Sequence, residues 1–321
     1  MKRERFDPQK AERIVEMEGV SSLECYRFTD ETLRRVLKDV SLLVRRSEVW
    51  GITCDEPFEM ALLMEIMGNI KPYEAGRCSL SQMGMMQSKR RVLEHMFYIN
   101  DQKLMYPHMD VLSWLMFASQ HTGGTAAARQ VEWLELLLAL DLHDLTFTYS
   151  RFLTAAEQAV VALMLTLKMP RIQLVLIDLS HMEVPLTLYP AFSGITERLR
   201  AQGKAVVLAS AQRDLIQQCA HHAAFLLDGK LERQGMVEEL CARYDKRRLL
   251  VRAGEPERLA RALSDAFPGA RIVEREGEAW ICEERLRVSE VVAALERSGV
   301  GFEDIEIVKP SLELAFQEVA S

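Results

Sequence analysis

The sequence predicts an α/β protein with a largely parallel central sheet, followed by a small α+β domain. Apolar segments of strand length, such as residues 174–178 and 205–208, alternate with helical segments. Strands that are buried on both faces of a parallel sheet have this uninterrupted apolar pattern. The composition changes at the charged residues 244–248, and the segments beyond them follow a βαββαβ order, the split βαβ arrangement. We therefore expect two domains with separate cores.

The composition limits the classes of protein and partner. The chain has 321 residues, of which 49% are hydrophobic, and a formal net charge of −7. A chain of this length can bury one large core and a small second one, and an acidic chain is not expected to bind nucleic acid. No apolar run reaches the roughly 18 to 20 residues that span a bilayer, and the polar residues 1–12 do not resemble a signal peptide. We therefore expect a cytoplasmic location.

Strand-like runs precede the first helix of the large domain, within residues 14–49. The first helix is predicted at residues 58–67, because apolar residues recur there with helical spacing and a glycine and a proline follow. A basic turn at residues 89–91 then leads into a predicted strand at residues 92–99. The clearest strands before the helix are predicted at residues 40–44 and 49–53.

The second half of the large domain alternates helices with strands. Residues 110–142 contain two apolar helical stripes that Gly123-Gly124 separates. Thr154, with Glu157 three residues later, forms a capping-box pattern that begins a helix ending near residue 167. The remaining elements are predicted as a helix at residues 195–201 and strands at residues 174–178, 205–208 and 223–227.

The small domain is predicted from a regular alternation after the charged segment. Its second helix is stopped by Gly299, and its strands are short. The predicted strands are residues 249–251, 271–274, 279–282 and 305–308, the predicted helices are residues 257–266 and 289–297, and residues 310–319 form a last short helix.

The turn between the strand at residues 49–53 and the helix at residues 58–67 is the expected place for a nucleotide. A working phosphate loop has glycines around the phosphates, a lysine for the terminal phosphates and a Ser/Thr hydroxyl for magnesium. Residues 51–61 keep only Gly51, contain Pro57, which has no N–H, and carry three carboxylates but no Lys or Arg. Two unit charges about 4 Å apart interact by ~4 kcal/mol at an effective dielectric constant near 20, so this exchange should lower phosphate affinity about 10³-fold or more.

Several framework segments resemble the nucleotide-binding subunits of ABC transporters, in the same order along the chain. They are Asp39-Val40-Ser41, Lys71-Pro72 with Gly76, Tyr98-Ile99, Tyr106-Pro107, Gly229-Lys230-Leu231 and Gln234-Gly235. Residues 310–316, PSLELAF, resemble the end of ABC-2 type exporter ATPases. The resemblance implies an ABC-type, P-loop NTPase-like cassette with a β-rich subdomain, a parallel core sheet and a helical subdomain. It implies a cassette at residues 13–243, a helical subdomain at about 105–155 and a C-terminal α+β domain at 247–321.

The family's catalytic motifs fall mostly on residues of the wrong chemistry. The phosphate-loop lysine corresponds to Met60, and the magnesium-binding Ser/Thr to Ala61. The Walker B aspartate is retained as Asp178, but the catalytic glutamate after it corresponds to Leu179, and the switch histidine to Ala211. The resemblance therefore implies a chain without a general base for the attacking water and without a γ-phosphate contact.

The remaining family motifs are also altered. The glutamine that senses magnesium and the membrane subunit corresponds to Asp101, or to Gln102 if the alignment shifts by one residue. The signature motif corresponds to residues 153–157, and the D-loop aspartate falls near Pro185. The vestigial nucleotide-binding positions implied by the resemblance are Gly51, Tyr26 and Thr154.

Some of these residues have a simpler structural interpretation, which we favour. Asp178 is expected to accept hydrogen bonds from neighbouring backbone rather than to bind a metal, and Thr154 to cap its helix rather than to touch a nucleotide. Tyr26, with Phe28, is expected to pack in a core rather than against adenine. His221-His222 has no further ligand at metal spacing, and the six cysteines form no CxxC pattern, so no metal site is predicted.

The leading hypothesis is a pseudo-ATPase subunit of an ABC-2 type transporter. It would dock on a membrane permease at the inner face of the membrane, through Tyr106, Pro107, Met109 and Leu112, and pair with a second cassette or a second copy. No cofactor is expected, and ATP with magnesium would bind only weakly or through a partner subunit. Two alternatives stay open: a stand-alone regulatory or scaffold protein built on the same fold, and a weakly active ATPase.

Overall fold

The computed structural model of the protein describes most of the chain in two compact units. It describes residues 12–27, 33–81, 83–84, 89–102, 104–242, 248–253, 256–275, 278–282, 287–308 and 311–320. The division between the units falls between Val237 and Glu238. The predicted polar arm at residues 1–12 lies outside the described residues except for Glu12, as does the charged segment 244–248 except for Arg248.

An antiparallel sheet forms one layer of the first unit. Two of its strands overlap residues 14–49, where the sequence predicts strand-like runs, and two lie at residues 73–84, where no strand was predicted. Its strand order is β4-β1-β6-β7, and β1 pairs antiparallel with both β4 and β6. Buried residues alternate along β4, which is the pattern of a strand with one face on a core. The strands are β1 (Arg13–Ser22), β4 (Val40–Arg45), β6 (Tyr73–Leu80) and β7 (Met83–Gly84), and β2 (Cys25–Arg27) pairs separately with β3 (Leu33–Arg35).

A second, mostly parallel sheet forms the centre of the first unit. Its order is β12-β11-β5-β10-β9-β8, and only β12 runs antiparallel to its neighbour. The strands are β5 (Val49–Thr53), β8 (Met96–Ile99), β9 (Leu174–Asp178), β10 (Ala205–Ala209), β11 (His222–Leu227) and β12 (Lys230–Met236). The five parallel strands therefore end along one edge of the sheet, which we call the carboxyl edge.

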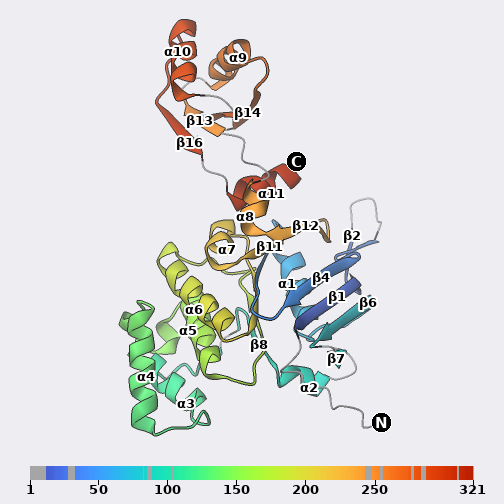
Figure 1. Ribbon diagram of the computed structural model, residues 1–321, viewed down its shortest axis with the longest axis vertical. Helices are drawn as coiled ribbons and strands as arrows, with labels where there is room; N and C mark the ends of the chain where they lie inside the picture. Colours follow the sequence, from blue (N-terminus) through green and yellow to red (C-terminus); the bar gives the residue numbers. More distant parts are fainter. Residues whose placement is uncertain are drawn as a thin grey trace. The chain divides into compact units, whose positions relative to one another are not determined.

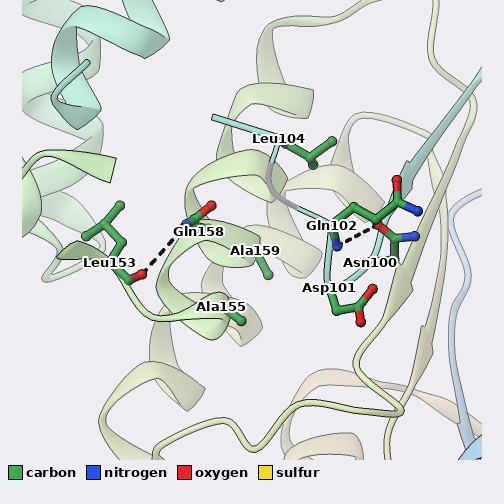
Figure 2. Close-up of a pocket in the computed structure, with 8 residues that line it drawn as sticks. All are labelled: Asn100, Asp101, Gln102, Leu104, Leu153, Ala155, Gln158 and Ala159. Atoms are coloured by element: carbon green, nitrogen blue, oxygen red, sulfur yellow. Dashed lines mark hydrogen bonds between the residues drawn. The ribbon is translucent and has the colours of Figure 1, made fainter. Parts of the chain in front are cut away.

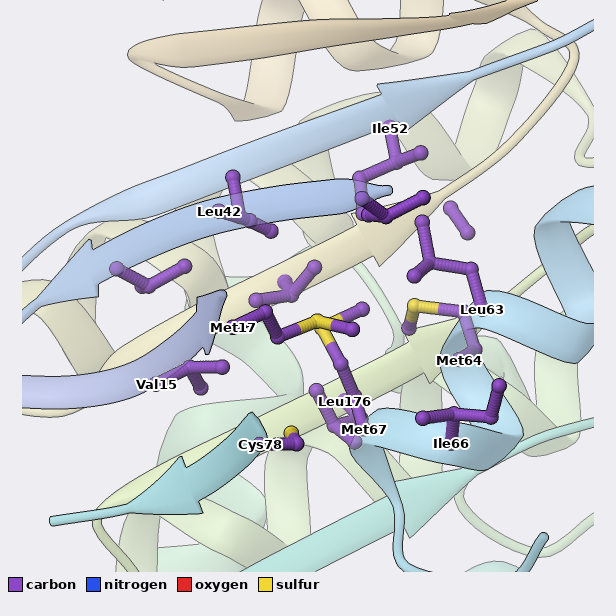
Figure 3. Close-up of a cluster of buried hydrophobic side chains, with 14 of the residues drawn as sticks. Val15, Met17, Leu42, Ile52, Leu63, Met64, Ile66, Met67, Cys78 and Leu176 are labelled. Atoms are coloured by element: carbon purple, nitrogen blue, oxygen red, sulfur yellow. The ribbon is translucent and has the colours of Figure 1, made fainter. Parts of the chain in front are cut away.

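Helix α1 (Pro57–Met67) packs between the two sheets and builds the main core (Figure 1). Seven of its eleven residues are buried, as expected for a helix that is apolar around most of its circumference. Its Leu63, Met64 and Met67 lie among side chains from both sheets, including Met17 of β1 and Leu176 of β9 (Figure 3). The observed helix begins one residue before the predicted one.

Helices α5 (Ala155–Leu165), α6 (Tyr189–Ala201) and α7 (Arg213–Cys219) cover the parallel sheet away from α1 (Figure 1). Helices α3 (Val111–Ala118) and α4 (Ala126–Ala139) pack on each other, and Gly123 and Gly124 adopt positive φ angles between them, where the sequence predicts a break. Short 3-10 turns connect these helices: η2 (His143–Leu145), η3 (Ser150–Phe152), η4 (Thr166–Lys168) and η5 (Leu186–Leu188).

One local prediction was wrong. The basic residues predicted as a turn begin the short helix α2 (Lys89–Leu93), and strand β8 starts at Met96 rather than at residue 92. Val92 is buried within the helical turn, so its apolar character reflects packing and not strand pairing. Among the described residues, none of the helices combines the length and apolar character of a membrane span.

The second unit has the predicted βαββαβ arrangement. Its sheet order is β14-β15-β13-β16, all antiparallel, and its core contains Leu249 of β13, Leu259 and Leu263 of α9, Ile281 of β15 and Leu295 of α10. The elements are α8 (Val237–Ala242), β13 (Arg248–Arg252), α9 (Pro256–Ala266), β14 (Arg271–Arg275), β15 (Glu278–Cys282), α10 (Val288–Ser298), β16 (Asp304–Val308) and α11 (Leu312–Ala320).

Candidate functional site

The carboxyl edge brings together motif positions that are far apart in the sequence. In open parallel sheets, ligands bind beside this edge. The turn at residues 54–56 follows β5, and Asp178 ends β9. Ala211 follows β10, and Asp101 follows β8. The edge is therefore the candidate functional site, and its chemistry depends on what the side chains there contact.

Gly51 lies within β5 and not in the turn. A Cβ atom added to it would lie 2.1 Å from Cγ2 of Ile216, so α7 can pack on β5 only where no side chain intervenes. Close packing therefore accounts for this glycine without a phosphate. Met60, which the resemblance assigns to the position of the phosphate-loop lysine, is fully buried in α1, and Ala61 follows it half-buried.

The turn after β5 receives a cation from a distant segment. Asp55 forms an ion pair with Arg213, the first residue of α7. The Arg213 side chain is only 9% exposed, whereas the Asp55 side chain is 67% exposed, so the carboxylate lies on the solvent side of the guanidinium. The turn itself contains no cation, and Arg213 could not be predicted as a partner of Asp55 because nothing in the local sequence pattern relates two residues so far apart.

Glu59 ties the same turn to the other neighbouring strand. Its Oε2 atom accepts a hydrogen bond from the backbone N–H of Gly229, at 3.0 Å, and lies 3.7 Å from the Cys54 thiol. Gly229 follows β11 at a φ of +76°, and a Cβ atom there would lie 1.9 Å from the Val36 carbonyl oxygen. Burial raises the pKa of the Glu59 carboxyl group, and the Gly229 hydrogen bond opposes that rise.

Asp178 is also held by internal hydrogen bonds. Its Oδ2 accepts from the Tyr98 hydroxyl of β8 at 2.9 Å, and its Oδ1 accepts from the Ser180 N–H at 3.1 Å and from the Ser180 hydroxyl at 2.5 Å. Leu179, which the resemblance assigns to the position of the catalytic glutamate, is buried, and its N–H donates to the carbonyl of Ala209. The structural interpretation of Asp178 therefore has specific donors, two of them side-chain hydroxyls.

These contacts form a continuous series along the carboxyl edge. Four of them join segments at two neighbouring strands of the parallel sheet, and the fifth joins the turn after β11 to the segment before β4; we call the set the edge ties. They are Tyr98 to Asp178, Gln212 to Val184 through two hydrogen bonds of 2.7 and 3.0 Å, Arg213 to Asp55, Glu59 to Gly229, and Lys38 N–H to the Gly229 carbonyl at 2.8 Å. The polar groups of the edge ties are thus engaged within the protein.

A small pocket separates the carboxyl edge from α5 (Figure 2). Asp101 and Gln102 line one side, and Ala155 and Gln158 of α5 line the other. Both Asp101 and Gln102 are exposed, and the Gln102 N–H donates to Asn100 Oδ1. The Gln158 side chain points toward the segment before α5, where its Nε2 donates to the Leu153 carbonyl (Figure 2).

Thr154 caps α5 as the sequence predicted. Its Oγ1 accepts from the Glu157 N–H at 3.2 Å, and its own N–H donates to Glu157 Oε2 at 2.7 Å, which completes a capping box. The start of α5 is therefore supplied with a carboxylate from within the helix. A carboxylate there already uses the attraction that the helix dipole offers to an anion.

The four docking candidates do not all lie at the surface. Tyr106 is 50% exposed, Pro107 is exposed and Met109 is half-buried, but Leu112 is only 6% exposed and belongs to the core of α3. A docking role for Leu112 is therefore incompatible with its position.

Other exposed aromatic residues lie near Tyr106. Its ring makes an edge contact with Phe117 at 5.8 Å, and the Ser150 hydroxyl donates to its carbonyl. Tyr149 and Phe152 flank Ser150, and the Arg151 guanidinium lies 5.4 and 4.8 Å from their ring centroids. We call Tyr106, Phe117, Tyr149 and Phe152 the aromatic patch.

The remaining candidates show no site. The Tyr26 side chain and all of Phe28 lie outside the described residues. His222 stacks on Trp50 with ring centroids 4.9 Å apart, and His221 lies 3.5 Å from Glu197. Within the described part of the chain, no three His, Cys, Asp or Glu side chains gather as metal ligands. Pro185, at the D-loop position, precedes η5 and is exposed.

Comparisons with known proteins identify the fold. No protein-family model matches the chain, and no curated protein matches it. Among solved structures, the ATP-binding subunit of an ABC transporter superposes with a TM-score of 0.56 at 15% identity, covering 72% of this chain and 93% of that one. The ATP-binding cassette MJ0796, in a dimeric post-hydrolysis state with ADP and Pi, has a TM-score of 0.55 at 16% identity, covering 70% and 98%.

A third similar structure is cbiO1 from Clostridium perfringens, part of the ABC transporter complex cbiONQ. Its TM-score is 0.56 at 14% identity, covering 80% of this chain and 96% of cbiO1. Identities this low show the fold and not the activity. The β-rich layer, the parallel sheet and the helices around it therefore have the fold of an ABC transporter ATP-binding cassette.

Proposed function

We propose that this chain is a nucleotide-independent cassette subunit of an ABC-2 type transporter, with a structural or regulatory role. The observation that carries the proposal is the series of edge ties, because they engage at the carboxyl edge the groups that a nucleotide would need. The fold supports a place in a transporter, and the similar structures include a dimer and a part of a transporter complex. The subunit would complete a cassette pair and transmit movement to membrane helices.

The residues at the edge do not fit ATP with magnesium. A triphosphate there would meet the exposed carboxylates of Asp55 and Glu56, and Arg213 already has a carboxylate partner. Each repulsive pair of unit charges about 4 Å apart costs ~4 kcal/mol at an effective dielectric constant near 20. Asp178 accepts three hydrogen bonds, so binding a hydrated magnesium ion would first require breaking them. We therefore derive no catalytic step through a nucleotide.

Docking on a permease is assigned to the aromatic patch. Exposed aromatic residues are enriched at protein interfaces, where they bury a large area at little cost in side-chain entropy. The patch would receive the apolar face of a cytoplasmic helix of the permease, with Tyr106 and Pro107 at one side. This places the chain on the cytoplasmic face of the membrane, held there through the permease, with a second cassette or a second copy as its other partner.

Calorimetric titration of the full chain with ATP and magnesium tests the nucleotide part of the proposal. We expect no saturation up to millimolar ATP and no hydrolysis. Micromolar affinity, or magnesium-dependent release of phosphate, would instead favour an active ATPase.

Co-expression with a neighbouring gene product that has about six membrane spans tests the transporter part. We expect the two proteins to purify together from detergent. With a Phe152→Ser variant, the amount of membrane protein recovered should be at least tenfold lower than with the wild type. A matched control is Phe147→Ser, which removes another exposed phenylalanine from the same segment. A soluble homodimer that does not purify with the membrane protein would favour a stand-alone scaffold.

A further inference from the structure

We propose that α4 carries a surface through which this chain pairs with a second copy of itself, in an antiparallel contact between two helices. The surface is a row of apolar residues on the solvent side of α4, which we call the α4 stripe. It lies apart from the aromatic patch, to which the proposed function assigns docking on a permease. The residues of the α4 stripe are Ala127, Val131, Leu134 and Leu138.

The α4 stripe is exposed along its whole length. Helix α4 packs into the first unit through Trp133 and Leu137, which are buried on its other side, and it lies at the left margin of that unit in Figure 1. The three larger members of the stripe are between 37% and 67% exposed, with Leu138 the most exposed. Single exposed leucines are common on protein surfaces, but a row of apolar side chains along one helix face marks a contact with another protein.

The spacing of the α4 stripe is that of a helix that packs on a second helix. Its members follow one another in steps of four, three and four residues from Ala127 to Leu138. The apolar positions of a coiled coil alternate in this way, because 3.6 residues per turn then bring them into one narrow strip. The partner that fits such a strip is therefore another apolar helix face and not a small ligand.

The α4 stripe is complementary to itself when two copies run antiparallel. A two-fold axis between Val131 and Leu134 places Val131 beside Leu134 of the second copy. The same axis places Ala127, the smallest member, beside Leu138 of the second copy. Interfaces between identical chains commonly have two-fold symmetry, in which each pair of residues occurs twice. Pairing a small side chain with a large one fills the space between the helices, whereas a parallel pair would set Leu138 against Leu138.

The charges beside the α4 stripe favour the same arrangement. Glu135 flanks the stripe, and the two-fold axis places it beside Gln130 of the second copy rather than beside a second Glu135. Asp141 follows α4 with a side chain that is 92% exposed, and it would lie near the first turn of the second copy's α4. The positive end of the helix dipole there attracts an anion. An anionic membrane surface would instead repel these acids, so a second copy suits the stripe better than a lipid surface does.

A contact of this size predicts a weak dimer. Stable protein interfaces bury about 1,200 to 2,000 Å² in total, and α4 is only 14 residues long. We therefore expect an association that depends on protein concentration, with a dissociation constant in the micromolar range.

Sedimentation equilibrium of the full-length chain, from low micromolar to several hundred micromolar protein, measures this association. Leu138→Glu should weaken the dimer at least tenfold, because it places a carboxylate in the apolar seam of each copy. The matched control is Leu186→Glu, which changes a leucine of η5 that is 73% exposed, and it should leave the dissociation constant unchanged. Val131→Glu takes the place of Leu138→Glu if circular dichroism shows that the latter variant is not folded.

Cysteine cross-linking tests the antiparallel orientation. In the double variant Ala127→Cys with Leu138→Cys, each new thiol lies beside its counterpart in the second copy, so mild oxidation should give a covalent dimer. The two thiols of one copy are eleven residues apart on one helix, roughly 16 Å, which is too far for them to join. Each single variant should give at least fivefold less dimer. The wild type under the same oxidant measures the background from its own cysteines, such as the exposed Cys25.

A monomer at every concentration would overturn the inference, and so would a dimer that Leu138→Glu weakens no more than Leu186→Glu does. Single cysteine variants that cross-link as well as the double variant would exclude the antiparallel contact. A monomeric chain whose recovery of membrane protein falls with Leu138→Glu would assign the α4 stripe to the permease and also overturn the inference. Failure to purify with the membrane protein, with the α4 dimer intact, would contradict only the proposed function.

Discussion

The Glu59 side chain is an acid, which does not suit a phosphate loop, but it accepts a hydrogen bond that joins two segments at the carboxyl edge. Its carboxylate is almost fully buried and satisfies the N–H of Gly229, a glycine that the Val36 carbonyl forces to remain a glycine. Burial raises the pKa of Glu59, so ionisation of this group weakens the folded state as the pH rises. The useful property of Glu59 is its acceptor oxygen and not its charge.

We therefore expect Glu59→Gln to stay within about 1 kcal/mol of the wild type in unfolding free energy at pH 7, because the amide oxygen can accept the Gly229 N–H. Glu59→Ala should lose about 2–3 kcal/mol, because it leaves that N–H buried and unpaired beside a cavity. Because the folded-state pKa is raised, the stability of the wild type relative to Glu59→Gln should fall as the pH rises through it. Urea unfolding between pH 4 and 7 measures both effects; equal losses in the two variants would mean that the charge matters.

Lys204 gives a second prediction at a single residue. Its ammonium group is buried and donates to the carbonyls of Thr166 and Met169, and burial lowers its pKa to about 8. Between about pH 8 and its ordinary value of 10.5, the unfolded chain holds a proton that the folded chain has released, so stability should rise with pH.

At about 1.4 kcal/mol per pKa unit, the wild type should gain up to about 3 kcal/mol over Lys204→Met across this range. Buried thiols such as Cys78 and Cys219 titrate at high pH with the opposite sign, so the measurement is the difference between the two proteins. Denaturant unfolding at pH 7.5 and 10 provides it, and a difference that stays constant with pH would contradict the assignment.

At the residue scale, the resemblance predicts altered catalytic positions but not the contacts that their side chains make. Met60 and Leu179 are apolar residues at positions that the resemblance assigns to catalytic residues, and their burial follows from their chemistry. The pairing of Asp55 with Arg213 depends on β5 and β10 being neighbours in the sheet, which no local pattern specifies. The charge near the turn therefore includes a cation from α7 that the residues of the turn do not reveal.

Among the elements, α5 has the most specific sequence signal. The Thr154 and Glu157 pattern predicted its first turn, and the structure contains both hydrogen bonds of the capping box. Thr154→Ala should cost about 1 kcal/mol of unfolding free energy and should increase hydrogen exchange in the first turn of α5. Thr154→Ser keeps the hydroxyl and should remain near the wild type. If the serine variant loses as much as the alanine variant, the methyl group and not the cap stabilises this turn.

The elements that were predicted well and badly differ in length and context. Strands β5 and β9 were predicted with the observed bounds, because each is an apolar run flanked by turns. The segment at residues 89–99 was predicted wrongly, because the apolar residues of a short helix and of the following strand form one nearly continuous apolar run in the sequence. Short apolar runs do not distinguish a helical turn from a strand, and here the tertiary packing of Val92 decides.

On the scale of the whole molecule, alternation of strands and helices predicted a parallel sheet but could not give the strand order. That order places β5 between β10 and β11, and it alone allows the turn after β5 to reach both neighbours through Asp55 and Glu59. The edge ties are thus a property of the topology. A sequence without an alignment shows which acids are present in the turn, but only the fold shows what they hold.

The two compact units should unfold separately, since each has its own apolar core. Leu263 of α9 and Leu176 of β9 are fully buried in different cores, and a buried Leu→Ala change costs about 2–5 kcal/mol. Because a smaller unit has a smaller unfolding entropy, Leu263→Ala should lower the midpoint of one calorimetric transition by about 10 °C or more and leave the other in place. Leu176→Ala should lower the midpoint of the other transition. The change in midpoint for each kcal/mol of lost stability should be smaller there, because the first unit is larger. A single transition that moves with both substitutions would show that the two cores unfold as one cooperative unit. The second unit would then contribute directly to the stability of the first.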